Sequence, residues 1–171
     1  MSEKKIQLKP LTREYFASFG DVIDICDSNH VIPINDGLAN RHHDLATVDV
    51  NDQNGHAIIS IIDTNRTQLP LRVSVMERHP LGSQAFIPMG NSPYIVLVAP
   101  AGEFDADKLQ GFLAQANQGI NYAKGTWHHA CISHIQPNQF LVVDRGGDGA
   151  NCDFVVLPEA SNIFIEDSEA V

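Results

Sequence analysis

Short segments in which apolar and polar residues alternate recur along most of this chain, with Gly, Pro, Asn or Asp between them. A period of two is typical of a strand with one buried face, and strands that recur at roughly ten-residue spacing are typical of sandwiches and barrels. We expect strands at residues 22–25, 57–62, 71–77, 84–87, 94–99, 129–135, 140–144 and 153–157. The pattern therefore predicts a mostly β fold.

Two segments carry a helical pattern instead. Residues 11–20 place aromatic side chains on one helical face, with Thr12 able to cap the first turn and Gly20 able to end the last. A second helix is expected between Asp105 and Gly119, because its apolar residues recur at three- and four-residue spacing. The acidic C-terminal segment contains Ile-Phe-Ile at 163–165, which we expect to pack on the domain or on a partner subunit.

The composition fits one ordinary globular domain over residues 1–171, with 43% hydrophobic and 19% charged residues. No segment approaches the roughly 18 consecutive apolar residues of a membrane span. The N-terminal sequence MSEKKIQLKP also lacks the apolar segment of a signal peptide. We therefore expect a cytoplasmic protein that does not engage a membrane.

Charge and cysteine content exclude further classes. The formal net charge of −10 at pH 7, without a basic cluster, argues against nucleic acid as a partner. Cys26, Cys131 and Cys152 are far apart and form no C-x-x-C pair, so neither a disulfide framework nor a redox motif is expected. A small molecule is the expected partner, and an anionic one would need local arginines.

Polar residues that suit chemistry concentrate after the alternating segment 71–76. Glu77 and His79 are two residues apart, so on a strand both side chains point to the same face. A turn containing Pro and Gly follows, and Gln84 leads the next apolar run. We expect these groups to form half of a small-molecule site.

The second half is expected from His128 or His129. Neighbouring residues of a strand point to opposite faces, so only one of the two can share a cavity with His79. Glu77, His79, Gln84 and His128 would supply a carboxylate, two imidazoles and an amide oxygen, a set that suits nickel, manganese, iron or zinc. The alternative is that these histidines form hydrogen bonds inside a barrel without a metal.

A second polar cluster lies at residues 34–44. Asn35 begins an Asn-Asp-Gly sequence that is typical of a turn, and an arginine, two histidines and an aspartate follow it. Arg41 and His43 are therefore candidates for holding an anion and moving a proton. The alternative is a solvated loop.

The order of these residues resembles the cupin family of small jelly-roll barrels. Glu77-Arg78-His79 stands where the first cupin motif has His-x-His, and Gln84 stands where it has glutamate. Gly-Thr-Trp-His at 125–128 matches the Gly-x-x-His of the second motif. The resemblance implies a cupin-like double-stranded β-helix with a few short peripheral helices and a metal between the motifs, although two ligand positions differ from the family pattern.

Longer segments resemble the ureidoglycolate lyase family over nearly the whole chain. They are FGDVI at 19–23, INDGLANRHHDLA at 34–46, ERHPLGSQAFIPM at 77–89, QGINYAKGTWHH at 118–129, DRGG at 144–147 and NCD at 151–153. The resemblance implies cleavage of (S)-ureidoglycolate to glyoxylate and urea in allantoin degradation. It also implies a cupin-like homodimer and nickel as an associated metal.

The chemistry of this substrate gives expected roles to the candidate residues. The reacting carbon bears a hydroxyl, a ureido nitrogen and a carboxylate, so elimination of urea needs a base, an acid and a group that holds the carboxylate. A metal on the four ligands above would polarise the hydroxyl. The expected catalytic residues are His43, His128, His129 and Glu77. The expected substrate-binding residues are Arg41, which we prefer for the carboxylate, with Asn35, Arg78, Arg145 and Trp127.

Three other functions fit part of the pattern. A different cupin enzyme acting on a small hydroxy-acid would be separated by oxygen-dependent redox activity. An amidohydrolase acting on the same substrate would release ammonia instead of urea. A sensor that only binds a sugar or acid usually carries a basic or helix-turn-helix segment, which the sequence lacks.

Overall fold

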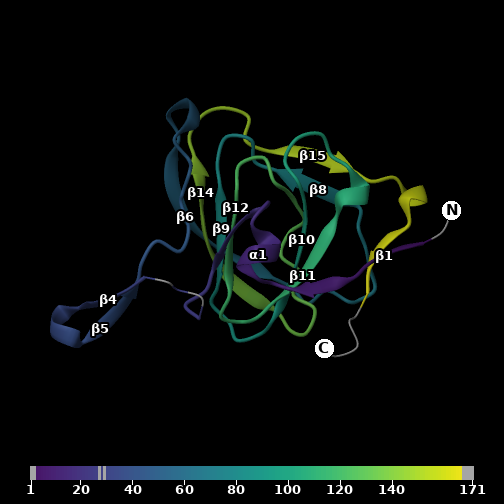
Figure 1. Ribbon diagram of the computed structural model, residues 1–171. Coiled ribbons are helices and arrows are strands. Elements are labelled where there is room, and N and C mark those ends of the chain that lie inside the picture. Colours follow the sequence, from purple (N-terminus) through teal and green to yellow (C-terminus); the bar gives the residue numbers. More distant parts are fainter. Residues whose placement is uncertain (1–2, 27, 29, 167–171) are drawn as a thin grey trace.

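The structure is a computed structural model that describes residues 3–26, 28 and 30–166, and it is built mainly from strands (Figure 1). The strands are β1 (Lys4–Ile6), β2 (Leu8–Pro10), β3 (Gly20–Ile23), β4 (Val31–Ile34), β5 (Ala39–His42), β6 (His56–Thr64), β7 (Leu71–Arg72), β8 (Val75–Arg78), β9 (Gln84–Pro88), β10 (Tyr94–Ala99), β11 (Gln110–Ala114), β12 (Gly119–Tyr122), β13 (Trp127–His128), β14 (Asn138–Gly146), β15 (Asp153–Val156) and β16 (Ile163–Ile165). The helices are α1 (Arg13–Phe16) and the 3-10 turns η1 (Asn35–Gly37), η2 (Asp52–Asn54), η3 (Ala106–Lys108) and η4 (Glu159–Ser161).

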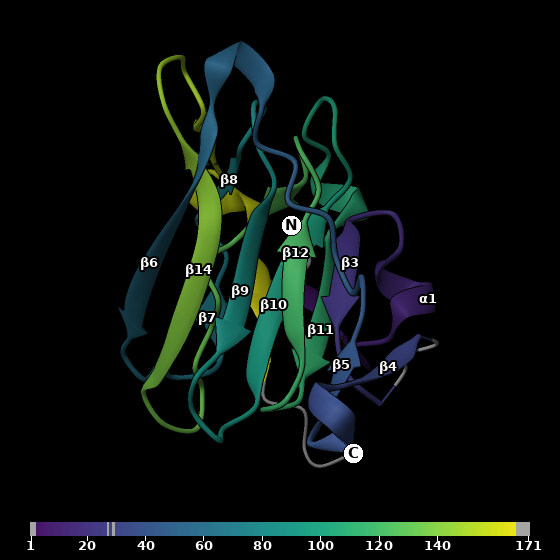
Figure 2. The same cartoon turned by 90° about the vertical axis from the view of Figure 1, so that its left-hand side faces the viewer.

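Two large sheets pack face to face. One has the strand order β15-β8-β13-β10-β11-β2 and the other β3-β12-β9-β14-β6, and Figure 2 views the five-stranded sheet from its outer side. Alternate side chains of both sheets meet in one buried core, among them Val96, Val98, Phe86, Phe140 and Val142. The expected mostly β, cupin-like architecture is confirmed.

A second core covers the outer face of the six-stranded sheet. The small sheet β1-β16-β7 lies there, and Ile163 and Ile165 of β16 are buried against Met76 and Leu97. The segment 163–165 therefore packs on its own chain, which was one of the two expected outcomes.

Most of the alternating segments form strands where expected. Residues 94–99 form β10, and 57–62, 84–87, 140–144 and 153–157 lie mainly within β6, β9, β14 and β15. The segment 71–77 is interrupted and gives β7 and β8. The expected strand at 129–135 is wrong, because beyond β13 the chain makes only isolated bridges, from Ile132 to Ile95 and from Ser133 to Arg66.

The first expected helix is shorter than its pattern, and the second is wrong. Thr12 does cap α1, accepting a hydrogen bond from the Tyr15 amide at 3.2 Å, but the helix ends at Phe16 and Gly20 instead begins β3. The segment after Asp105 forms the short turn η3 and then strand β11. Strand β11 contacts both cores, so its two apolar faces imitate the spacing of a helix.

Strands β4 and β5 form a hairpin that projects away from the two packed sheets (Figure 1). They pair only with each other in the described chain, and every residue from Val31 to Arg41 is exposed or half-buried. The turn η1 at the tip contains Asn35 and Asp36 with φ of 54° and 55°, a conformation that Asn and Asp adopt more readily than most residues. Among the described residues, no helix has the length and apolarity needed to cross a membrane.

Candidate metal centre and active site

The candidate site lies between the two large sheets, where β8 and β13 are neighbours. Glu77 pairs directly with His128 across these strands, and His79 follows β8. Ligand atoms of all three side chains lie within 4.8 Å of one another, and the rings of His79 and His128 are 5.1 Å apart. The expectation that these side chains meet is confirmed, and we call them the triad.

The strand register shows that His128 of the triad points into the space between the two large sheets. His128 pairs with Val98, whose side chain belongs to the core between the sheets, so His128 points to the same side. It is only 1% exposed, and the Tyr122 ring from the opposite sheet stacks on it at 4.2 Å. The imidazole is therefore held from both sheets.

Hydrogen bonds fix the tautomer of both triad histidines. His79 Nδ1 lies 2.6 Å from the Asn151 carbonyl oxygen, and His128 Nδ1 lies 2.9 Å from the Thr126 carbonyl oxygen. A carbonyl only accepts, so each Nδ1 donates and each Nε2 keeps a lone pair. Both Nε2 atoms are buried without a hydrogen-bond partner in the described residues. Metal-bound histidines are oriented in this way.

The pKa of Glu77 is lowered from its ordinary value. The neighbouring His128 side chain is the largest cause and His79 adds to it, whereas burial acts in the opposite direction. Glu77 Oε1 lies 3.5 Å from His128 Nε2. An ionised carboxylate beside two imidazole lone pairs is a donor set that fits a divalent transition metal.

The opposite sheet adds an amide and a carboxylate. Gln84 pairs with Tyr122 and lies two residues before the core residue Phe86, so it also points inward. Its Nε2 donates to Asp144 Oδ2 at 3.1 Å, which leaves the buried Oε1 without a hydrogen-bond partner in the described residues. Gln84 Oε1 is therefore oriented as a free oxygen donor.

Tyr122 and Asp144 were missed as functional candidates in the sequence. Asp144 had a signal, since it is a carboxylate that continues the inward positions of Phe140 and Val142 in an apolar run. Tyr122 had none, because an aromatic in a strand is usually a core residue.

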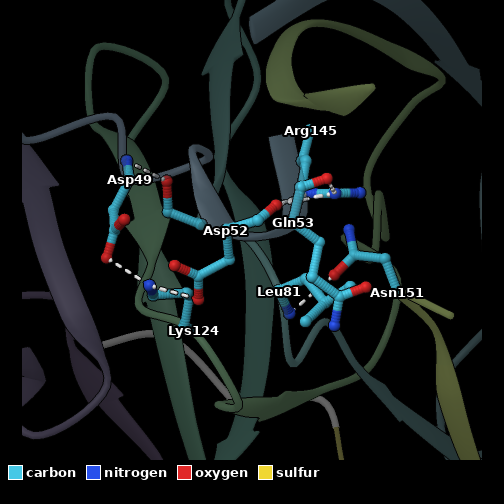
Figure 3. Close-up of polar contacts among 8 residues, drawn as sticks. Asp49, Asp52, Gln53, Leu81, Lys124, Arg145 and Asn151 are labelled. Atoms are coloured by element: carbon cyan, nitrogen blue, oxygen red, sulfur yellow. Dashed lines mark hydrogen bonds and ion pairs between the residues drawn. The ribbon is translucent and has the colours of Figure 1, made fainter. Parts of the chain in front are cut away.

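The backbone carbonyl of Asn151 orients His79, and Figure 3 shows Asn151 next to Leu81, near the bonds made by Arg145. The Asn151 side chain accepts from the Leu81 amide at 2.8 Å. Arg145, 7% exposed, donates to the carbonyl oxygens of Asp52, Gln53 and Asp148 in the loops on either side.

Comparison with known proteins decides the family. The sequence model described as ureidoglycolate lyase matches residues 3–164. A protein named ureidoglycolate lyase from Burkholderia mallei (strain NCTC 10229) is 49% identical over 157 residues, which cover 92% of each chain. Proteins of the same name from Pseudomonas aeruginosa (strain LESB58) and Burkholderia cepacia are 43% and 47% identical, over 95% and 89% of this chain and 96% and 86% of theirs. The chain belongs to the ureidoglycolate lyase family.

Two of the residues that we expected to bind substrate in this family lie on the other face of their sheet. Arg78 and Trp127 neighbour Glu77 and His128 in their strands, so they point outward. Arg78 forms an ion pair with Asp153 at 2.8 Å, and its guanidinium lies 4.7 Å from the Trp127 ring centre. The structure does not place them with the triad.

The remaining family segments divide between two pockets. His129 lines a pocket of about 100 Å³ together with Glu77 and His128. Arg41 and His43 line a different pocket of about 430 Å³ on the outer face of the five-stranded sheet. Asn35 lies further out, at the tip of the hairpin. One chain therefore brings His129 to the triad, but not Arg41, His43 or Asn35.

Proposed function

We propose that this chain cleaves (S)-ureidoglycolate to glyoxylate and urea in allantoin degradation. Membership of the ureidoglycolate lyase family supports the lyase activity and the substrate. The observation that carries the placement of the reaction is the convergence of Glu77, His79 and His128 with two buried Nε2 lone pairs. We place the reaction at this triad.

The triad and Gln84 Oε1 would hold a divalent metal, and the family resemblance favours nickel. When bound, such an ion acts as a Lewis acid that lowers the pKa of a coordinated hydroxyl. Asn151 and Thr126 keep the two Nδ1 atoms protonated, and Asp144 orients the Gln84 amide. Three of the four donors, on His79, His128 and Gln84, thus have their orientation fixed before substrate binds.

Proton transfer is assigned to His129. Its Nδ1 lies 2.9 Å from the Ala130 carbonyl oxygen, so Nδ1 donates and Nε2 is free to accept a proton. His129 takes the proton of the substrate hydroxyl, the C–O bond becomes a carbonyl, and the C–N bond breaks with its electron pair on nitrogen. The imidazolium then returns the proton to that nitrogen, which leaves as urea. No water is consumed.

We also propose a cytoplasmic homodimer. The support is exposed apolar surface on the two edge strands: Ile59 and Ile61 of β6 are 71% and 59% exposed, and Phe154 and Val156 of β15 are 63% and 75% exposed. Exposed apolar surface of this kind is typical of an interface with another protein.

The test is product analysis with racemic ureidoglycolate. The expected result is release of glyoxylate and urea in equal amounts, with only one enantiomer consumed. Ammonia in place of urea would establish the amidohydrolase reaction, and no conversion at all would refute the proposed function. Metal analysis of the purified protein, repeated with His79→Ala, is expected to show a divalent metal in the first and its loss in the second.

A further inference from the structure

The β4–β5 hairpin lacks the packing that an isolated hairpin needs. Two strands alone are marginally stable in water, yet Val31, Ile34 and Leu38 are 45%, 37% and 88% exposed. No sheet of the described chain receives either strand. The hairpin, residues 31–42, is therefore built to be covered by something outside its own chain, and we call it the arm.

One face of the arm combines apolar residues with a cation. Ile32 pairs with Arg41 and Ile34 pairs with Ala39, so these four side chains lie on the same face. Arg41 is exposed, and none of the ion pairs among the described residues includes it. The arm thus presents a free guanidinium within an apolar surface.

The triad lacks what the arm carries. Besides Glu77 and His128, the described pocket beside the triad is lined by Val75, His129, Ala130 and Phe154, and neither an arginine nor a lysine is among these residues. Arg78 is held by Asp153 on the outer face, and Arg145 is held by loop carbonyls. A substrate carboxylate beside the triad therefore has no free guanidinium from the same chain among these neighbours.

The sandwich is open beside the triad, along the edges formed by β6 and β15. Ile58 and Ile62 of β6 pair with inward-facing residues of β14 but are 38% and 40% exposed. Phe154 and Val156 pair with Glu77 and Val75, so they face the same side as the triad, and they are also exposed. We call these apolar residues the mouth; Val75 and Phe154 also line the pocket that contains Glu77 and His128.

We propose that the arm of one chain docks at the mouth of a second copy, and that its Arg41 there binds the substrate carboxylate. The apolar face of the arm matches the apolar mouth, and the guanidinium of the arm matches an anionic substrate bound beside the triad. In a twofold dimer each chain gives one arm and receives one. The active site is then composite, with the triad from one chain and Arg41 from its partner. This inference rests on the proposed function.

The test is complementation between two damaged chains. Arg41→Ala and His79→Ala are each expected to lower the rate at least about tenfold in homodimers. The two variants are co-expressed with different affinity tags, and the heterodimer is purified through both tags. One of its two sites then has an intact triad and receives an intact arm, so about half of the wild-type rate returns. If Arg41 acts within its own chain, every site carries one lesion and no activity returns, which overturns the proposal.

Two measurements that need no activity separate this proposal from the proposed function. Wild-type protein is expected to have the mass of a dimer in light scattering, and Leu38→Asp is expected to shift this mass toward that of a monomer. A monomeric wild type would overturn the proposal that the arm docks on a second copy. Arg41→Ala is expected to keep its dimer mass and the metal content of the wild type, because Arg41 contacts substrate and not metal. If the wild type is a dimer that leaves ureidoglycolate intact, the proposed function fails, and with it the role given to Arg41.

Discussion

The triad and the arm both carry imidazoles in segments that resemble one family, but they are organised in opposite ways. His128 is 1% exposed, stacked by Tyr122 and fixed in one tautomer by the Thr126 carbonyl. Arg41 is exposed on a hairpin whose two strands pair only with each other within the described residues. Strand register in one chain is sufficient to organise the first group, whereas Arg41 lines a pocket on the outer face of the five-stranded sheet, apart from the triad. Under the proposal above, one chain completes the triad by itself, whereas its Arg41 acts at the site of a second chain.

The largest expected effect comes from removing a triad imidazole. His79→Ala or His128→Ala is expected to lower kcat/KM by roughly 10²- to 10⁴-fold, because either change removes a ligand of the metal that would polarise the reacting hydroxyl. Steady-state kinetics with metal analysis and far-ultraviolet circular dichroism would measure this. The matched control is His56→Ala, an exposed histidine on β6. Folded triad variants with wild-type rates would exclude the triad from the reaction.

Replacing Arg41 is expected to lower activity, whereas replacing Arg78 is expected to lower stability. Arg41→Ala removes a charge-assisted contact with substrate, so kcat/KM should fall by about 10- to 100-fold with little change in Tm. Arg78→Ala removes the Asp153 ion pair and the contact with Trp127, so Tm should fall by a few degrees while kcat/KM stays within about threefold. The reverse result would place Arg78 at the substrate.

The sequence was sufficient for elements whose alternation reflects one buried face. Residues 94–99 were expected as a strand and form β10. Strand β11 was misread because it contacts a core on each face, so Leu109, Phe112 and Leu113 imitate a helical stripe. Residues 129–135 were misread because, within the described chain, only Ile132 and Ser133 form isolated bridges there and no continuous ladder forms.

The site was predictable to the extent that local spacing determines it. Glu77 and His79 share a face because they are two residues apart, and His128 joins them through the pairing of β8 with β13. The sequence could not predict that Arg145 joins loops. Its partners are backbone carbonyls, which every residue has, so the residue types of those loops give no sign of the contact. The same limit applies to Tyr122, whose importance depends on which ring it meets.

A smaller effect is expected from Asn151, which orients His79 through its backbone carbonyl but is not itself in the triad. Asn151→Ala removes the bond to the Leu81 amide and loosens the loop whose carbonyl orients His79. Metal affinity should fall by about tenfold, the usual size for a residue that orients a ligand, while the metal-free protein unfolds almost as before. Isothermal titration with nickel would measure the affinity. Asn65→Ala, at an exposed position just after β6, is the control and should bind metal normally.

The smallest effect concerns the root of the arm, where Asp24 anchors the chain before the hairpin leaves the sheet. Burial raises the pKa of Asp24, but hydrogen bonds from the Cys26 amide and the Gln118 side chain, at 2.9 and 3.0 Å, outweigh it and leave this pKa below its ordinary value of 3.8. A carboxyl whose pKa is lowered by folding stabilises the protein above its ordinary pKa, and this stabilisation is lost as the pH falls through the folded-state value.

Asp24→Asn is therefore expected to lower the free energy of unfolding by about 1 kcal/mol at pH 7 and by less at pH 3. Urea unfolding of wild type and variant across this pH range measures the difference. Asp36→Asn, at the exposed tip of the arm, should change stability little at either pH. If the difference in free energy of unfolding between wild type and Asp24→Asn stayed constant as the pH fell, the charge of Asp24 would not be the source of its stabilising effect.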